Sequence, residues 1–374
     1  MIAPNTPVWD DEADWVPLPP LTGDAVCDVC VIGLGGSGLV AIRALREHGV
    51  DVIGVDAADA GAGAAGRNGG LLLAGLAEFH HDAVRSLGHE RAVAMYRRTL
   101  TEIERVLAEF PDCTRRTGSL RIAASDAERD DCRAQLAQMQ ADGLPVEWYV
   151  GPEGEGILVP TDGVMQPLRR VRAMARKAIH DGAILHGRTT VREISGTRVV
   201  TDRGTITCRR VIVAVDGRLE ALVPELSSRV RTARLQMLAT APASELAIPR
   251  PVYWRDGFEY WQQLPDGSIA LGGFRDAELE AEWTHDATPS AGIQARLERF
   301  LRDTLRVQSP ITHRWAASVA YTETGAPICE EVRAGVFVIG AYSGTGNVVG
   351  ALCARDAVVW ATLTSEKHVG AGEE

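Results

Sequence analysis

Lysine is almost absent from this sequence of 374 residues: among 39 basic residues, only Lys177 and Lys367 are lysine. Cofactor chemistry that needs a lysine Schiff base, such as that of pyridoxal phosphate, therefore has almost no candidate residue. Acidic residues outnumber basic ones, and the net charge is −11. A nucleic acid partner is not expected, because an acidic surface repels a phosphate backbone.

Long apolar runs are also missing. No stretch of roughly 18 apolar residues occurs, so the sequence predicts no membrane-spanning helix. Residues 1–20 are polar and rich in proline, without the basic and apolar regions of a secretory signal. We therefore expect a cytoplasmic protein with no membrane partner.

The seven cysteines are an odd number, and only Cys27 and Cys30 have the CxxC spacing of a redox or zinc site. These two lie in a strand-like segment, where residues three apart face opposite sides of a sheet. We favour buried strand cysteines over redox or zinc chemistry, so no metal site is predicted. Seven reduced cysteines fit a cytoplasmic location.

A glycine turn stands near the start of the chain. The apolar run 26–32 is followed by Gly33, Gly35 and Gly38 in the spacing G-x-G-x-x-G, and then by an amphipathic helix. In such a motif the first glycine allows the tight turn, the second lets backbone approach a pyrophosphate, and the third permits close helix–strand packing. Asp56 ends the next apolar run, where a carboxylate can bind a ribose diol. The sequence predicts a dinucleotide site, and the acid disfavours the 2′-phosphate of NADP.

This motif alone fits NAD or FAD, and two further segments favour FAD. Arg67-Asn68-Gly69-Gly70 follows Asp56, and its backbone and arginine can reach the far phosphate and the flavin. Near the C-terminus a strand leads into the glycine loop 342–347 and a long helix. The dipole at the start of that helix suits the negative charge of a reduced flavin. We therefore expect FAD as the cofactor.

The motifs DVCVIGLGGSGL, AAGRNGG, VIVAVDG, ALGGFRD and GAYSGTGN occur in the order found in the FAD-dependent D-amino-acid-oxidase (DAO) superfamily. The chain resembles this superfamily over nearly its whole length, and most nearly its glycine oxidase, sarcosine oxidase and gamma-glutamylputrescine oxidase branches. The resemblance implies that Val191 lies near the adenine, that Ala214 and Val215 line the adenosine end, and that 344–348 cradle the isoalloxazine edge. The expected cofactor-binding residues are Gly33, Gly35, Gly36, Ser37, Gly38, Asp56, Ala57, Arg67, Asn68, Gly69, Gly70, Val191, Ala214, Val215, Gly344, Thr345, Gly346, Asn347 and Val348.

The chain lacks three functional residues of the sarcosine oxidases. Those proteins carry a flavin-linking cysteine before a Tyr-Thr pair, where this chain has Val319 and Ala320. The resemblance therefore implies non-covalent FAD. The same branch has a lysine thought to help oxygen react and another that binds the substrate carboxylate, and these positions hold Ala270 and Val348 here. A sarcosine-like substrate is not expected, and an acceptor other than oxygen stays open.

The patterns predict an α/β fold (α+β overall), with a Rossmann-like FAD-binding domain of glutathione-reductase type and an inserted antiparallel-sheet substrate domain. Residues 209–217 and 335–363 have the strand and strand–loop–helix character of the first domain, whereas 226–315 reads as strands and turns with one helix at 290–306. The expected parts are a tail at 1–25, a discontinuous FAD-binding domain at 26–85, 155–225 and 318–374, and a substrate domain at 86–154 and 226–317.

The resemblance implies oxidation of a C–N bond in a small amine or amino acid, by hydride transfer to flavin N5 with O2 reduced to H2O2. No catalytic side chain is assigned, because positioning and desolvation of a neutral amine do most of the catalysis. Two alternatives stay open. One is a dehydrogenase with an acceptor other than oxygen, and the other is a non-catalytic FAD-binding subunit.

Aromatic and basic residues are the candidates for binding the substrate: Tyr253, Tyr260, Trp261, Arg275, Arg314, His80 and Tyr342. The run YWRDGFEYW alternates as a strand–turn–strand pair would, and its aromatic residues either line the site or fill a sheet core. Arg275 follows a strand end, where it can clamp a carboxylate or lie on the surface. His80 either lines the site or is a solvated loop histidine. The acids of 276–286 favour a cationic substrate or, more simply, form a solvated face.

Overall fold

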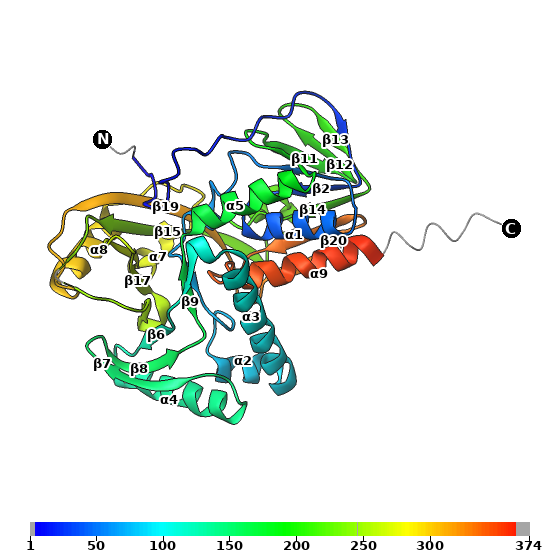
Figure 1. Ribbon diagram of the computed structural model, residues 1–374. Helices are drawn as coiled ribbons and strands as arrows, with labels where there is room; N and C mark the ends of the chain where they lie inside the picture. Colours follow the sequence, from blue (N-terminus) through cyan, green and yellow to red (C-terminus); the bar gives the residue numbers. More distant parts are fainter. Residues whose placement is uncertain (1–3, 245, 364–374) are drawn as a thin grey trace. The chain divides into compact units, whose positions relative to one another are not determined.

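The computed structural model describes residues 4–244 and 246–363, which form two compact units (Figure 1). Among these residues, unit 1 comprises 4–11, 67–167 and 233–318, and unit 2 comprises 12–66, 168–232 and 319–363. Each unit is thus assembled from three separate segments of the chain. We keep the functional domain limits as a prediction, because compactness alone does not assign a cofactor.

Unit 2 is built on a six-stranded sheet with the order β10-β3-β2-β14-β21-β20. Its strands are β10 (Ile184–His186), β3 (Val52–Val55), β2 (Val29–Ile32), β14 (Arg210–Val213), β21 (Val336–Gly340) and β20 (Ile328–Arg333). Neighbouring strands run parallel except for the antiparallel pair of β20 and β21. Every residue of β2, β3 and β21 is buried, as expected for parallel strands that are covered on both faces.

Helices α1 (Gly36–Glu47) and α9 (Val349–Leu363), blue and red in Figure 1, pack against each other in unit 2. A second, four-stranded sheet has the order β1-β13-β12-β11. The remaining elements of this part are β1 (Ala25–Val26), β11 (Val191–Ser195), β12 (Arg198–Thr201), β13 (Thr205–Thr207), α5 (Pro167–His180), α6 (Leu219–Leu222) and the 3-10 turns Ala64–Gly66 and Pro224–Leu226. Pro167 opens α5, where its missing N–H is harmless.

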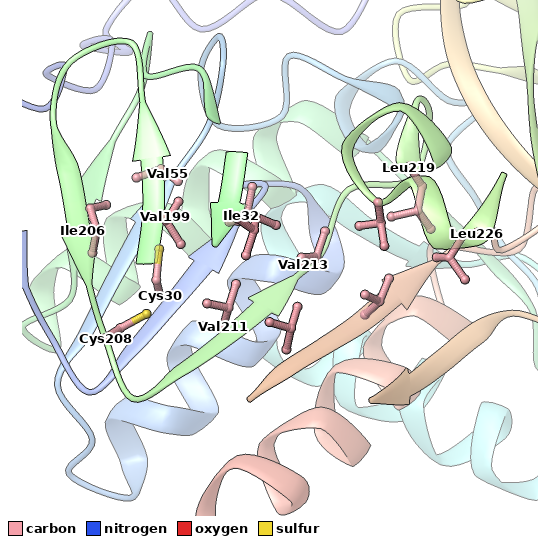
Figure 2. Packing of buried hydrophobic residues seen from close by; sticks show 14 of the residues in the cluster. Cys30, Ile32, Val55, Val199, Ile206, Cys208, Val211, Val213, Leu219 and Leu226 are labelled. Atoms are coloured by element: carbon pink, nitrogen blue, oxygen red, sulfur yellow. The ribbon is translucent and has the colours of Figure 1, made fainter. Parts of the chain in front are cut away.

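The core of unit 2 holds three of the cysteines among branched apolar side chains (Figure 2). Cys30 lies within β2 and is fully buried, and Cys27, between β1 and β2, is 6% exposed. Cys208 packs in the same cluster. Both cysteines are buried as predicted, but only Cys30 lies in a strand, and the two share one core cluster instead of facing opposite sides of a sheet. No disulfide joins the seven cysteines, all of which lie in the described part of the chain.

Unit 1 is built on an eight-stranded sheet with the order β19-β15-β18-β17-β16-β6-β8-β7. Its strands are β19 (Ile311–Thr322), β15 (Val230–Thr240), β18 (Ile269–Gly273), β17 (Glu259–Gln263), β16 (Val252–Trp254), β6 (Ser119–Ile122), β8 (Gly154–Val159) and β7 (Glu147–Gly151). The pairs β15–β18, β18–β17, β17–β16, β6–β8 and β8–β7 are antiparallel, whereas β16 and β6 are parallel. Helix α8 (Ala291–Asp303) packs its apolar side chains on one face of this sheet.

Further helices and a small sheet complete unit 1. The helices are α2 (His80–Leu87), α3 (His89–Glu109), α4 (Asp126–Ala141) and α7 (Leu279–Glu282), with 3-10 turns at Pro111–Cys113, Arg255–Gly257 and Arg275–Glu278. The small sheet has the order β4-β9-β5, with β4 (Leu71–Leu72), β9 (Gly163–Met165) and β5 (Thr114–Arg116). Among residues 4–244 and 246–363, no helix has the length and apolar character needed to cross a membrane.

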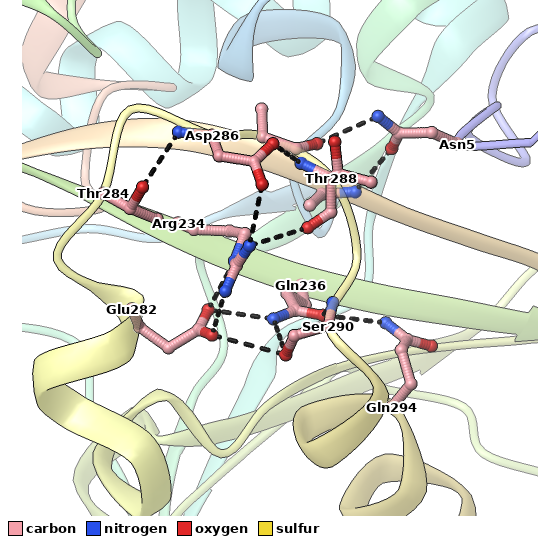
Figure 3. A network of polar contacts seen from close by, with 11 residues as sticks. Asn5, Arg234, Gln236, Glu282, Thr284, Asp286, Thr288, Ser290 and Gln294 are labelled. Carbon is pink, nitrogen blue, oxygen red and sulfur yellow. Dashed lines mark hydrogen bonds and ion pairs between the residues drawn. The ribbon is translucent and has the colours of Figure 1, made fainter.

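The acidic segment 276–286 is solvated at Glu280 and Asp286 but not at Glu282, which lies in a polar network (Figure 3). Glu282 is 1% exposed, and its carboxylate accepts hydrogen bonds from Arg234 on β15 at 3.1 and 2.8 Å and from Gln236 at 2.9 Å. Arg234 also reaches Asp286, at 3.5 Å. The interpretation of these acids as solvent-exposed was therefore wrong at Glu282. The negative charge of Glu282 is paired with Arg234 inside unit 1, so no cationic substrate is needed to explain it.

Candidate functional site

The glycine turn of unit 2 joins β2 to α1 and depends on two glycines for its own geometry. Gly33 has φ +103°, and a Cβ there would lie 2.7 Å from the carbonyl oxygen of Ala214. A Cβ on Gly38 would lie 1.9 Å from the carbonyl oxygen of Gly33. Both contacts are too short for any side chain. These two glycines are therefore explained by the tight turn and by close helix–strand packing.

The two glycines between them are less constrained by their protein neighbours, although Gly35 is close to Ala65. A Cβ on Gly35 would approach Ala65 Cβ at 3.3 Å, and a Cβ on Gly36 would meet no atom within 4 Å. Gly35 is the N-cap of α1 and contributes no side chain to it, so the first N–H groups of the helix need another acceptor. A bare backbone at a helix N-terminus suits a phosphate group. The turn fits a dinucleotide pyrophosphate.

Asp56 follows β3 at the same edge of the sheet. Its Oδ2 accepts from the N–H of Leu34 and its Oδ1 from the N–H of Ala58, both at 2.9 Å. Burial raises the pKa of this carboxyl group. Each carboxylate oxygen retains a second acceptor position for a hydroxyl donor, as a ribose provides. Ala57, beside it, is exposed.

The carboxyl ends of β2 and β14 meet next to this turn. The two strands pair in parallel, with Ile32 opposite Val213, so Gly33 and Ala214 lie at one edge of the sheet. Ligands of open α/β sheets bind at such an edge, where the strand order reverses. Val215 follows Ala214, and Val191, at the start of β11, packs partly buried against the same core. Ala214 and Val215 therefore lie at this sheet edge, whereas Val191 belongs to the four-stranded sheet, and the contact of all three with the adenosine stays a prediction.

The loop from β21 to α9 has an unusual backbone. Ala341, Ser343 and Gly344 have φ of +53°, +51° and +91°, which is the left-handed region. Thr345 donates from its N–H and its hydroxyl to the carbonyl of Tyr342, at 3.0 and 2.7 Å. The carbonyl of Thr345 in turn accepts from the N–H groups of Val348 and Val349, so the loop runs directly into α9.

Tyr342 is placed within unit 2, not at its surface. It is 5% exposed, and its ring lies against Gly350 of α9 near Ser37 of α1. Burial raises the pKa of its phenol. Tyr342 therefore has a packing role between two helices, and we do not retain it as a substrate residue.

Asp216, which the sequence analysis did not single out, supports this loop. Its Oδ1 accepts from the N–H of Tyr342 at 3.1 Å, and its Oδ2 from the N–H of Ala320 at 3.2 Å. Burial raises the pKa of Asp216 to about 6, although these backbone hydrogen bonds act in the opposite direction. An acid three residues after the end of the buried strand β14 is the sequence signal that could have identified it.

The Arg67–Gly70 segment belongs to unit 1, and its arginine is already engaged there. Arg67 donates from Nε to the carbonyl of Ala316 at 2.8 Å and from Nη2 to Asn5 at 2.6 Å. A Cβ on Gly69 would meet the Tyr260 ring at 2.9 Å, and one on Gly70 would lie 2.4 Å from the carbonyl oxygen of Met165. Packing within unit 1 explains these residues, so their contact with FAD stays a prediction.

The aromatic residues of 253–261 divide between the two faces of the unit 1 sheet. Trp254 and Trp261 lie on the α8 face, with ring centroids 5.3 and 5.5 Å from that of Phe300. Tyr253 and Tyr260 lie opposite each other on β16 and β17, with stacked rings 5.8 Å apart. Because successive strand residues face opposite sides, the tyrosines occupy the other face. Trp261 is thus a core residue and is withdrawn as a substrate candidate.

We call the second face the tyrosine face and define it by in-register residues of four strands. Arg121 on β6 lies opposite Tyr253, Tyr253 opposite Tyr260, and Tyr260 opposite Gly272. The Tyr260 ring covers Gly272, where a Cβ would lie 2.5 Å from it. Gln262, two residues along β17, donates to the carbonyl of Gly69 at 2.5 Å. The face therefore presents two phenols and a guanidinium from rigid strands.

Arg314 and Arg275 lie away from this face. Arg314 pairs with Glu298 of α8 at 2.6 Å, so it faces α8. Arg275 comes directly after β18, as expected, and its guanidinium stacks over the ring of Trp283 at 5.0 Å. Arg314 is thus paired with Glu298 of α8, and Arg275 is stacked on Trp283. We therefore do not retain either arginine as the residue that binds a substrate carboxylate.

His80 is a buried residue, so its interpretation as a solvated loop histidine was wrong. It opens α2, is 3% exposed, and its Nε2 lies 2.8 Å from Asp142. Asp142 also binds His89 at 2.6 Å. Burial alone would raise the pKa of Asp142, but hydrogen bonds from His89, Gln138 and His80 lower it to about 2. This cluster joins α2, α3 and α4 and holds His80 in a structural role.

Comparison with known proteins gives one consistent family. A model of the FAD-dependent oxidoreductase family, DAO, matches residues 28–360. A probable oxidoreductase OrdL of Rhizobium meliloti (strain 1021) is 30% identical over 367 residues, which is 90% of this chain and 83% of the relative. The gamma-glutamylputrescine oxidoreductase of Escherichia coli (strain K12) is 25% identical over 368 residues, or 89% of this chain and 83% of the relative.

Solved structures share the fold. The L-proline dehydrogenase of P. horikoshii superimposes with a TM-score of 0.72 at 20% identity, over 93% of this chain and 95% of the other. The glycine oxidase of Geobacillus kaustophilus gives 0.71 at 19% identity, over 90% and 95%. The predicted mixed α/β fold is confirmed, while the glutathione-reductase subtype stays a prediction.

Proposed function

The chain belongs to the FAD-dependent oxidoreductase family, and we propose that it oxidises a carbon–nitrogen bond of a small amine or amino acid. The observation that carries the proposal is the glycine turn of unit 2, which leaves room at Gly35 and Gly36 beside the start of α1. Relatives named for gamma-glutamylputrescine, L-proline and glycine support an amine substrate.

Unit 2 supplies most of the residues that would hold FAD. The N–H groups at the start of α1 would bind the pyrophosphate, and Asp56 would accept from the ribose hydroxyls. The loop 344–348 would bind the flavin edge through backbone N–H groups. Val319 and Ala320 lie on β19 where the sarcosine oxidases carry their linking cysteine, so non-covalent FAD is proposed.

FAD, when bound, supplies the acceptor for a hydride from the carbon beside the amine nitrogen. The chain contributes binding and orientation, and the tyrosine face is the proposed substrate surface. Tyr260 is held between Gly272 and Gly69, and Tyr253 stacks on it, so neither ring needs to be ordered when substrate arrives. Preorganised rings of this kind lower the entropic cost of binding.

Arg121 provides the cation of the tyrosine face. Its Nη1 donates to Gln135 at 3.1 Å, and its guanidinium lies 3.9 Å above the Phe79 ring. Among the described residues, no carboxylate forms an ion pair with it, and burial lowers its pKa. A partly buried guanidinium without a counter-ion suits a substrate carboxylate, which its fork can bind with two hydrogen bonds. We propose Arg121 in place of Arg275.

The acceptor is proposed to be O2, with H2O2 as the product. A second candidate, a dehydrogenase with another acceptor, is favoured by Ala270. This residue lies on β18 opposite Gln262, on the tyrosine face, where the sarcosine oxidases carry the lysine associated with oxygen. An apolar side chain there offers no positive charge to stabilise a developing superoxide or peroxide.

A panel of amines and amino acids mixed anaerobically with the purified yellow protein tests the proposal. We expect at least one compound to bleach the flavin absorbance, and air to restore it with formation of H2O2. Bleaching without peroxide, but with reduction of an artificial dye, would select the dehydrogenase. Failure of every compound to bleach the flavin would reject oxidation of amines and favour a non-catalytic FAD-binding subunit.

A further inference from the structure

Asp216 connects three segments of unit 2 that are far apart in the sequence. It follows β14, and its carboxylate accepts from the N–H of Ala320, 104 residues away, and of Tyr342, 126 residues away. The N–H of Ala341 is a further donor to it. The N–H of Ser343 binds the carbonyl of Ala320 at 3.2 Å, which closes the arrangement.

The loop held by this carboxylate is in a conformation that other residues must impose. Ala341 and Ser343 carry a Cβ and yet have positive φ, which L-residues seldom adopt without external support. The backbone is also tightly packed just before the loop, since a Cβ on Gly340 would lie 2.5 Å from the carbonyl oxygen of Val215. Ionised Asp216 supplies the strongest of the available supports, because hydrogen bonds to a charged acceptor are stronger than neutral ones.

The same loop sets the direction of the start of α9. The carbonyl of Tyr342, whose N–H is bound by Asp216, accepts from the N–H and hydroxyl of Thr345. The carbonyl of Thr345 then accepts the first helical hydrogen bonds, from the N–H groups of Val348 and Val349. Loss of the hydrogen bond from Tyr342 to Asp216 would therefore displace Tyr342 and Thr345, and with them the N–H groups of residues 346–348.

The charges around Asp216 are few. Glu220 on α6 is the acid that acts on it, and Glu220 itself binds the N–H and the hydroxyl of Thr232, at 2.9 and 2.8 Å. The loop presents the phenol of Tyr342, with the thiols of Cys329 on β20 and Cys353 on α9 beyond it. Burial and the repulsion from Glu220 both raise the pKa of Asp216, which is about 6.

We propose that Asp216 is a positioning residue whose carboxylate fixes the loop 341–348 in the conformation that binds the flavin edge. The inference rests on the proposed role of this loop in binding FAD, and not on any substrate. Protonation of Asp216 weakens its hydrogen bonds to the loop, so FAD binding becomes weaker in acid. Within residues 4–244 and 246–363, the carboxylate accepts hydrogen bonds from the loop and from β19, so it acts on the flavin through them.

The test compares wild type with Asp216→Asn, Glu220→Gln and Asp162→Asn. FAD dissociation constants and the visible circular dichroism of the flavin are measured from pH 7.5 to 5.0. In wild type we expect binding to weaken about 10-fold through pH 6. In Asp216→Asn we expect binding at pH 7.5 to be about 10- to 100-fold weaker, as for loss of a charged hydrogen bond, and the step near pH 6 to be lost, so that only the pH dependence due to Asp56 remains.

Two variants serve as controls with different expectations. Glu220→Gln removes the neighbouring negative charge, so the midpoint of the pH dependence should move to lower pH while binding at pH 7.5 is retained. Asp162→Asn alters a carboxylate of unit 1 that is likewise buried, with a pKa raised to about 7 and partners Ser119 and Ala74. This variant should keep the wild-type profile of FAD binding.

Hydrogen exchange of the segment 341–348 in the apoprotein supplies a readout without flavin. Asp216→Asn should increase its exchange. If exchange increases while FAD affinity and flavin dichroism stay unchanged, the loop does not hold the flavin and the inference is overturned. If Asp216→Asn does not fold, an unchanged midpoint in Glu220→Gln overturns it equally. No amine is used, so failure of amine oxidation leaves this test intact.

Discussion

Glycine serves different purposes in the turn 33–38 of unit 2 and the turn 67–70 of unit 1. In the second turn, Tyr260 and Met165 occupy the space that a side chain on Gly69 or Gly70 would need. In the first, a Cβ on Gly36 would meet no atom within 4 Å and one on Gly35 would meet only Ala65 Cβ, at 3.3 Å. Open space at a glycine does not by itself indicate a ligand, but here it lies at the N-terminus of α1, where a phosphate can bind. The motif in unit 2 is therefore the stronger indication of function.

The largest effect is expected for Gly35→Val, which tests the reading of the first turn. A branched side chain would hold backbone and pyrophosphate apart, so FAD affinity should fall at least 1,000-fold, or about 4 kcal/mol. The apoprotein should lose no more than about 1–3 kcal/mol of stability, because the new side chain crowds Ala65, whose Cβ lies 3.3 Å from the position of an added Cβ. Flavin titration and thermal unfolding measure the two effects. Full flavin occupancy would mean that this glycine serves only folding.

Trp261→Ala tests the division of unit 1 into a core face and a tyrosine face. Trp261 is 5% exposed and packs on Phe300, so its truncation should reduce the free energy of unfolding by about 3–5 kcal/mol. Tyr260→Phe, one residue away, loses only a hydroxyl and should cost less than about 1.5 kcal/mol. Its effect should instead appear in substrate affinity. Equal losses of stability in urea unfolding would contradict the division.

Gly70→Ala tests the packing explanation of the second turn. The added methyl group would overlap the carbonyl of Met165 and should destabilise unit 1 by about 1–3 kcal/mol. Gly143→Ala is the matched control, because Gly143 also has positive φ but no atom within 4 Å of an added Cβ. It therefore isolates the cost of the backbone conformation. Equal destabilisation of the two variants would reject the contact with Met165 as the cause.

Asp56→Ala returns to unit 2 and should weaken FAD binding by about 1–3 kcal/mol through a lost charged hydrogen bond to ribose. The exposed Asp51, at the opposite end of the same strand, provides the control as Asp51→Ala. Flavin fluorescence gives both dissociation constants. A constant that does not change in Asp56→Ala would reject the ribose contact.

The smallest effect concerns the pH dependence of stability. Burial raises the pKa of Asp162 in unit 1 to about 7, above its unfolded value. The folded protein therefore binds this proton more tightly, and the contribution of Asp162 to stability increases as pH falls from 8 towards 5. The slope is at most about 1.4 kcal/mol per pH unit. Asp162→Asn should remove it in denaturant titrations of the apoprotein, and an identical slope would assign the titration elsewhere.

Two kinds of residue escaped prediction from the sequence. Arg121 lies beside Tyr253, and Asp216 binds the N–H of Tyr342. Folding alone brings these pairs together, because the partners are far apart along the chain. His80 and Glu282 looked solvated because they are polar and surrounded by polar residues. Their partners Asp142 and Arg234 lie 62 and 48 residues away, and pairing is what permits their burial.

The sequence by itself determined the cofactor turn, because its requirements are local: positive φ at Gly33, no side chain at Gly38, and an acid at the end of the next strand. Such constraints can be read from neighbouring residues. Only the tertiary structure decided which face of the sheet carries Tyr260 and which carries Trp261. Alternation shows that two adjacent aromatic residues face opposite sides, but the side that α8 covers depends on packing between segments distant in the chain.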